Sequence, residues 1–262
     1  MNNGNLVPSV CIDAVFEGKP IEHALRTVSK CGYKAFEFWC WWEKDLEQLS
    51  ELCDEHGLEI SAFCTRFISL VDHAMRGEYL KGLQESIAAA QRLDCKTLIS
   101  QVGDFIPGRS REQQQQSLVD GLAQAAPILE SAGVTLVIEP LNERVDHAGY
   151  FLVQSDEAFD IIDQVNSPSV KVVFDIYHQQ ISEGDLMVNI KNNIDKIGHF
   201  HAAGNPGRNE LSSGEINYPH IFEMINQTDF EGYVGLEYWP KRDPADGLCE
   251  VAEVFSKLSE RT

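Results

Sequence analysis

Four apolar segments in the second half of the chain each end in, or next to, a side chain that can bind a metal ion. The segments cover residues 134–140, 170–175, 197–202 and 233–238, and the side chains are Glu139, Asp175, His201 and Glu237. Each segment has the continuous apolar character of a buried parallel strand. The four side chains are spaced 36, 26 and 36 positions apart. Each interval is close to the roughly 30 residues of a strand–helix–strand unit.

Parallel strands point the same way, so all four side chains are expected at one end of one sheet. Three carboxylates and one imidazole form an oxygen-rich donor set that suits Mn²⁺ or Mg²⁺, with Co²⁺ as a further fit. Structural zinc prefers thiolate and imidazole ligands. A buried salt bridge or a core histidine would explain any one of these residues alone. Their coincidence at four consecutive strand ends predicts a divalent-metal site in an enzyme.

The elements that position these residues alternate between strand and helix along the whole chain. Expected strands cover 7–16, 33–39, 58–65, 95–102 and the four segments above, and expected helices cover 21–31, 45–56, 78–93, 110–132, 155–165, 185–193, 218–226 and 248–258. Ser110 and Gln113 have the spacing of a capping box. Eight such units in 262 residues predict an α/β fold, a (β/α)8 TIM barrel, as one domain over residues 1–262.

Composition excludes several classes of function. The net charge of −20 opposes binding to nucleic acid or anionic lipid. No apolar run approaches the roughly 18 residues of a membrane span, and the first residues do not resemble a secretory signal. The seven cysteines are odd in number and scattered, as is typical of free thiols in a reducing compartment. We therefore expect a cytoplasmic protein that acts on a small molecule, with no nucleic-acid or membrane partner.

Two further residues are candidates for substrate binding. His178 follows Asp175 by three positions, just beyond a strand end, and Arg208 lies in the loop after the segment that carries His201. A guanidinium there can pair with a carboxylate or with hydroxyl groups. His199 also lies in that segment, and we expect its side chain to point away from the barrel interior and to have a structural role.

The second half of the chain resembles the xylose isomerase-like TIM-barrel family, and within it the hydroxypyruvate isomerase branch. The segments that carry the resemblance are 139–142, 149–152, 174–178, 198–210, 214–219 and 235–240, with a weaker match at 32–39. The resemblance implies a divalent metal held by Glu139, Asp175, His201 and Glu237. It also implies that Glu139 and Glu237 form the catalytic acid/base pair. His201 stands where hydroxypyruvate isomerase-like proteins often have Gln, and is similar to the tagatose-epimerase type instead.

These residues suit proton transfer between neighbouring carbons of a hydroxy-ketone through a cis-enediolate, which a divalent ion would stabilise. The expected reaction is aldose–ketose isomerisation of a small hydroxy-keto acid, namely hydroxypyruvate to tartronate semialdehyde. Ketose 3-epimerisation and inosose dehydratase-like dehydration remain open alternatives. An endonuclease IV-like activity would need more histidines, and a sugar sensor would be favoured by a missing carboxylate. Trp39, Trp41 and Trp42 follow the second strand and would cover the barrel mouth, form a hydrophobic cap or make a subunit contact. The last alternative leaves a homo-oligomer open.

Overall fold

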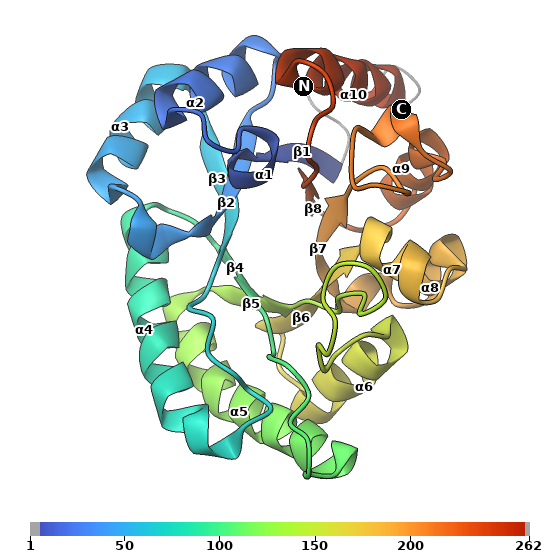
Figure 1. Cartoon of the computed structure of the whole chain (residues 1–262). Coiled ribbons are helices and arrows are strands. Elements are labelled where there is room, and N and C mark those ends of the chain that lie inside the picture. Colours follow the sequence, from blue (N-terminus) through green and yellow to red (C-terminus); the bar gives the residue numbers. More distant parts are fainter. Residues whose placement is uncertain (1–5, 260–262) are drawn as a thin grey trace.

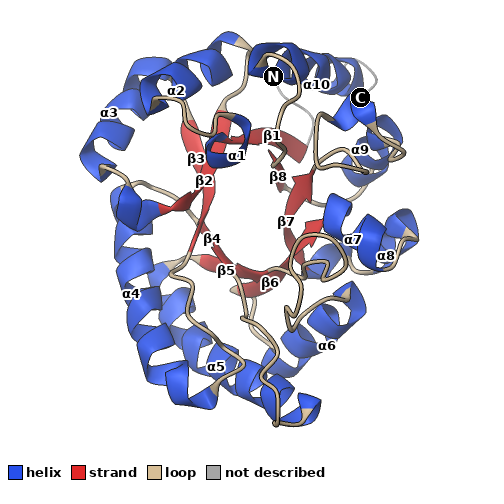
Figure 2. Cartoon of the chain, in the orientation of Figure 1, coloured by secondary structure: helices blue, strands red, loops and turns tan. Residues whose placement is uncertain are grey.

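Eight parallel strands form a closed barrel in the centre of the molecule (Figure 2). A computed structural model describes residues 6–259 of the chain. Each strand pairs with its neighbours in sequence, and β1 pairs with β8 to close the barrel. The strands are β1 (Leu6–Cys11), β2 (Ala35–Cys40), β3 (Glu59–Cys64), β4 (Thr97–Ser100), β5 (Thr135–Ile138), β6 (Val170–Asp175), β7 (Ile197–Ala202) and β8 (Gly232–Leu236).

Helices surround this barrel as an outer ring (Figure 1). They are α1 (Ile12–Val15), α2 (Ile21–Lys30), α3 (Leu46–His56), α4 (Arg76–Arg92), α5 (Arg111–Ala132), α6 (Ser155–Val165), α7 (Ile176–Ser182), α8 (Leu186–Asn192), α9 (Tyr218–Asn226) and α10 (Pro244–Ser259). Short 3-10 turns lie at Trp41–Glu43, His73–Met75, Ile194–Lys196 and Leu211–Ser213. Among residues 6–259, no helix has the length and apolar character needed to cross a membrane.

The predicted (β/α)8 barrel is confirmed, and most element positions agree with the sequence patterns. The capping box of Ser110 and Gln113 begins α5, and Gly133 ends it in the left-handed conformation, with a φ of 65°. Two differences lie at strand ends. The expected first strand, 7–16, stops at Cys11 because the chain turns into α1. The short helix α7 was not expected; the carboxylate of Asp175 caps it by accepting from the backbone N–H of His178.

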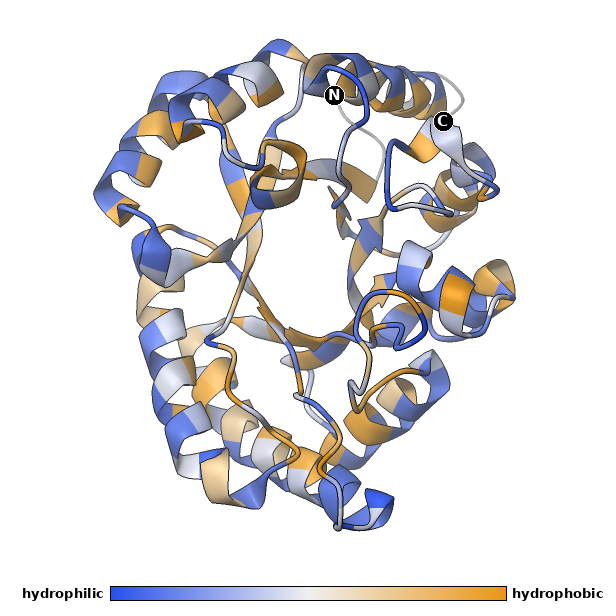
Figure 3. Cartoon of the chain, viewed as in Figure 1, coloured by the Kyte–Doolittle hydropathy of each residue, from blue (hydrophilic) through white to orange (hydrophobic). Residues whose placement is uncertain are grey.

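Apolar side chains pack in two layers. The larger layer lies between the strands and the outer helices, whose residues alternate between hydrophilic and hydrophobic (Figure 3). A separate small cluster lies inside the barrel and contains Ala62, Cys64, Ile99, Val137 and Val173. Successive strand residues point to opposite faces, so this inner cluster identifies which positions face the barrel interior.

Candidate active site

The four strand-end side chains lie together at the carboxyl-terminal end of the barrel. Glu139 directly follows β5, Asp175 ends β6, His201 lies near the end of β7, and Glu237 directly follows β8. Each residue offers a ligand atom, and these atoms all lie within 4.8 Å of one another. Their exposed fractions are 5%, 1%, 2% and 6%, respectively. The structure therefore brings together the whole set of predicted metal ligands.

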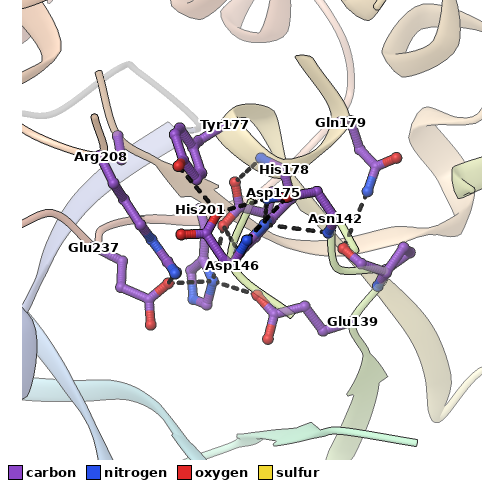
Figure 4. A network of polar contacts seen from close by, with 12 residues as sticks. Glu139, Asn142, Asp146, Asp175, Tyr177, His178, Gln179, His201, Arg208 and Glu237 are labelled. Atoms are coloured by element: carbon purple, nitrogen blue, oxygen red, sulfur yellow. Dashed lines mark hydrogen bonds and ion pairs between the residues drawn. The ribbon is translucent and has the colours of Figure 1, made fainter. Parts of the chain in front are cut away.

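The imidazole of His201 lies between the two glutamates (Figure 4). Its Nδ1 is 2.8 Å from Oε1 of Glu139 and 3.7 Å from Oε2 of Glu237. The same nitrogen is 3.9 Å from Oδ2 of Asp175. Nδ1 is thus the ring atom that faces the three carboxylates.

Burial and charge act in opposite directions on these groups. Burial raises the pKa values of Glu139 and Asp175 above those of ordinary carboxyl groups, although His201 lowers both. Burial would also raise the pKa of Glu237, but Arg208 and His201 outweigh it and the pKa is lowered. Burial would lower the pKa of His201, yet the surrounding carboxylates raise it well above its usual value.

The donor set fits one divalent cation. Oxygen and nitrogen ligands lie about 2.0–2.6 Å from Mn²⁺-, Mg²⁺- or Ca²⁺-type ions, so ligand atoms within 4.8 Å of one another can share one ion. When His201 is neutral, as a metal ligand must be, three buried carboxylates beside the single guanidinium of Arg208 leave two negative charges that need compensation. A divalent ion supplies it.

Arg208 reaches into the site from the β7–α9 loop. Its Nη2 donates to Oε2 of Glu237. The guanidinium lies between two aromatic rings, 5.4 Å from the centroid of Tyr177 and 5.1 Å from that of Trp239. Within residues 6–259, its buried Nε has no hydrogen-bond partner. Arg208 is thus adjacent to the predicted ligands and retains a free donor.

His178 also lies beside the site and is completely buried. Its Nδ1 accepts from the backbone N–H of Asn142 at 3.3 Å and lies 2.6 Å from Nδ2 of the same residue. Burial and Arg208 lower the pKa of His178 well below its usual value, so the ring is neutral. These contacts assign its proton to Nε2. That atom is 3.7 Å from Oδ2 of Asp175 and has no hydrogen-bond partner in the part of the chain that the structure describes.

The prediction that the side chain of His199 points away from the barrel interior is wrong, whereas its expected structural role is not contradicted. Residues two apart in a strand point to the same face, so His199 faces the barrel interior together with His201. Their rings meet edge to face, with centroids 5.1 Å apart. Nε2 of His199 lies 2.9 Å from Oε2 of Glu37, a buried carboxylate on β2. Burial would raise the pKa of Glu37, but His201 and His199 outweigh it and lower the pKa to about 2.

Two contacts of this cluster were not predicted from the sequence. Glu37 is a lone acid among the apolar residues of β2, and that isolation was the available signal. Trp39 contacts the cluster directly, since its Nε1 donates to Oε1 of Glu237 at 2.7 Å. The guanidinium of Arg66 lies over the rings of the other two tryptophans, Trp41 and Trp42.

Several known proteins are similar to this chain in sequence or in architecture. Hydroxypyruvate isomerase from Escherichia coli (strain K12) is 34% identical over 229 residues, which are 84% of this chain and 88% of the relative. A 2-oxo-tetronate isomerase from Cupriavidus necator is 41% identical over 138 residues, 53% of each protein. A crystal structure of an AP endonuclease, family 2, from Brucella melitensis has a TM-score of 0.90 and 27% identity, covering 95% of this chain and 98% of that one.

The curated relatives are named isomerases, which confirms the expectation of an isomerase-like enzyme. The model of one family, described as xylose isomerase-like TIM barrel, matches residues 25–258. Because this match covers most of the chain, the chain belongs to the xylose isomerase-like TIM barrel family.

Proposed function

We propose that the protein is a divalent-metal-dependent isomerase that converts hydroxypyruvate to tartronate semialdehyde. The convergence of Glu139, Asp175, His201 and Glu237 within 4.8 Å carries the proposal, because it combines a cation site with two candidate proton carriers. The relatives named hydroxypyruvate isomerase and 2-oxo-tetronate isomerase support a small hydroxy-keto acid as the substrate class.

The reaction moves a carbonyl group to the neighbouring carbon. A base removes a proton from the hydroxymethyl carbon, and an acid returns a proton to the adjacent carbon, which was the carbonyl carbon. The hydroxyl proton passes to the oxygen of the former carbonyl group, so that the aldehyde forms on the carbon that lost hydrogen. Glu139 and Glu237 lie on either side of His201 and can face a substrate from two directions (Figure 4). A bound divalent ion would supply positive charge that stabilises the enediolate.

Arg208 and His178 are proposed to hold the substrate. The free Nε–H of Arg208 can donate to a substrate carboxylate while its Nη2 holds Glu237. The unpartnered Nε2–H of His178 can donate to a substrate oxygen. A carboxylate bonded to a charged donor gains about 1.5–3 kcal/mol, which favours a keto acid over a free sugar.

Ketose 3-epimerisation is the second candidate, because two carboxylates on different sides of the substrate could exchange a proton at one carbon. His201 in the ligand set also favours it, being similar to the tagatose-epimerase type. Phosphodiester cleavage is disfavoured, because a net charge of −20 repels DNA.

Proton NMR in D₂O distinguishes the candidates. The purified protein would be incubated with hydroxypyruvate or a ketohexose panel, with Mn²⁺ or Mg²⁺ and with a chelator as control. We expect metal-dependent formation of tartronate semialdehyde that carries deuterium on the carbon gaining hydrogen. Deuterium at C3 of a ketohexose with inert hydroxypyruvate would establish epimerisation instead. Equal turnover after chelation would reject metal dependence.

A further inference from the structure

A second polar layer lies beneath the proposed metal ligands. Glu37 is in the middle of β2, between Phe36 and Phe38, and is only 2% exposed. A buried carboxylate is costly unless it has charged or hydrogen-bonding partners. Its position therefore requires an explanation that the ligand set itself does not provide.

Each oxygen of the Glu37 carboxylate lies next to a different histidine. Oε1 lies 3.1 Å from Nε2 of His201, and Oε2 lies 2.9 Å from Nε2 of His199. The hydroxyl of Ser61 also donates to Oε2, at 3.3 Å. Glu37 is thus held in place from one side and reaches His201 on the other.

The ring of His201 points its two nitrogens in different directions. Nδ1 faces Glu139, at 2.8 Å, while Nε2 faces Glu37. A histidine that binds a metal through Nδ1 must carry its proton on Nε2, and the group that accepts from Nε2 fixes this tautomer. Within residues 6–259, Nε2 has no aligned hydrogen-bond partner, and Oε1 of Glu37, an ion-pair contact 3.1 Å away, is the oxygen that can accept from it after a small rotation of the ring.

Strand β8, which pairs with the strand that carries His201, leaves room for the carboxylate of Glu37. Gly235 on β8 is paired in register with His201. A Cβ at Gly235 would lie 2.0 Å from Oε1 and 2.5 Å from Oε2 of Glu37. Glu37 can therefore occupy this buried position only because residue 235 has no side chain.

We propose that Glu37 is a positioning residue that accepts from Nε2–H of His201 and thereby directs Nδ1 toward the metal ion. His199 and Ser61 hold Glu37 in the required orientation. This inference rests on the metal site of the proposed function. The group of Glu37, His199 and His201 could alternatively hold a second ion of its own. The geometry favours positioning, because the facing nitrogens already lie 2.9 and 3.1 Å from the carboxylate.

Metal binding tests the inference without depending on turnover. Binding of Mn²⁺ would be measured from the electron paramagnetic resonance signal of the free ion, for wild type, Glu37→Gln and Glu59→Gln. The Glu59 variant removes the same charge from an exposed position at the start of β3. We expect one Mn²⁺ per chain, an unchanged Kd in Glu59→Gln, and a Kd about 10–100-fold weaker in Glu37→Gln.

Three results would overturn the inference, and they have different meanings. An unchanged Kd in Glu37→Gln rejects the positioning role and leaves the metal site intact. Two Mn²⁺ per wild-type chain, with one lost in Glu37→Gln, makes Glu37 a direct ligand. No Mn²⁺ binding by wild type rejects the metal-dependent function itself.

The tautomer of His201 can also be determined in the wild-type protein, so this second measurement does not require Glu37→Gln to fold. Wild-type protein with ¹⁵N-labelled histidine would be saturated with Zn²⁺ as a diamagnetic probe. The His201 signals would be assigned by their loss in His201→Gln. We expect a proton on Nε2 and a metal-bound Nδ1. A proton on Nδ1 would contradict the proposal.

Discussion

Gly235→Ala is the sharpest test of the polar layer beneath the site. The new methyl group would lie 2.0 Å from Oε1, 2.4 Å from Cδ and 2.5 Å from Oε2 of Glu37. Ordinary carbon–oxygen contacts are about 3.3 Å or longer, so the carboxylate or β8 must move by about 1.3 Å. A movement of that size would lengthen the 3.1 Å approach of Oε1 to Nε2 of His201.

The expected loss of stability follows from these contacts. Forcing extra atoms into a packed interior costs about 1–3 kcal/mol. Separating a buried carboxylate from its partners costs about 3–5 kcal/mol when the pairing is lost completely. A carboxylate that shifts but keeps His199 loses only part of this, so we expect a decrease of about 2–5 kcal/mol in the free energy of unfolding.

Urea unfolding and Mn²⁺ binding would be measured on the same variants. Gly77→Ala is the matched control, since a Cβ there meets nothing within 4 Å and the residue lies in α4. Alanine is expected to be neutral or to stabilise that helix by about 0.5–1 kcal/mol. In Glu37→Ala/Gly235→Ala the clash is gone, so the two effects should not add. Full stability and unchanged Mn²⁺ affinity in Gly235→Ala would refute the reasoning.

Three further predictions concern the site itself. Glu139→Gln and Glu237→Gln should each lower turnover at saturating Mn²⁺ by at least about a hundredfold, and near-normal steady-state rates would remove that residue from acid–base catalysis. Arg208→Ala and His178→Ala should raise the KM for a keto acid while largely preserving the Kd for Mn²⁺, with about 1.5–3 kcal/mol of binding lost in the arginine variant; an unchanged KM would contradict this. Burial lowers the pKa of His201, but the carboxylates raise it above the usual value, so the metal-free ring is protonated at neutral pH and Mn²⁺ must displace that proton. Calorimetry in buffers of different ionisation enthalpy should show proton release and weaker binding as pH falls, whereas buffer-independent heats would argue against it.

The clustering of the strand-end side chains could be predicted because it follows from chain direction alone. Parallel strands deliver their last residues to one end of the barrel, so Glu139, Asp175 and Glu237 needed no knowledge of side-chain packing. The boundaries of α5 were equally local, because Ser110 and Gly133 act on backbone groups next to them in sequence. Features that depend on neighbouring residues were therefore readable from the sequence.

The second layer could not be predicted in the same way. Its contacts join Glu37 to His199 and His201 across residues more than 160 positions apart in the chain. No local pattern fixes which strands meet across a closed barrel. The error at His199 was different, since it came from assigning opposite faces to residues two apart in one strand. Counting the strand period correctly would have placed both histidines in the interior.

The two-residue period of a strand also determines which side chain lies beneath each residue of the site. Two positions before Glu139 and Asp175, and on the same face, lie Val137 and Val173 of the inner apolar cluster. Glu139 and Asp175 thus lie above valines, and burial raises the pKa values of both carboxyl groups. Two positions before His201 lies His199, so the imidazole of His201 lies above a polar pair, His199 and Glu37, instead of above a valine.

Glu237 differs from the other two acids because polar groups hold both of its oxygens. Trp39 donates to Oε1 and Arg208 to Oε2, and its pKa is lowered despite burial. Without a cation, a proton would therefore bind to Glu139 before Glu237. The surroundings of Glu237 therefore favour its ionised form, while those of Glu139 and Asp175, above the valines, favour the protonated form unless a cation is bound.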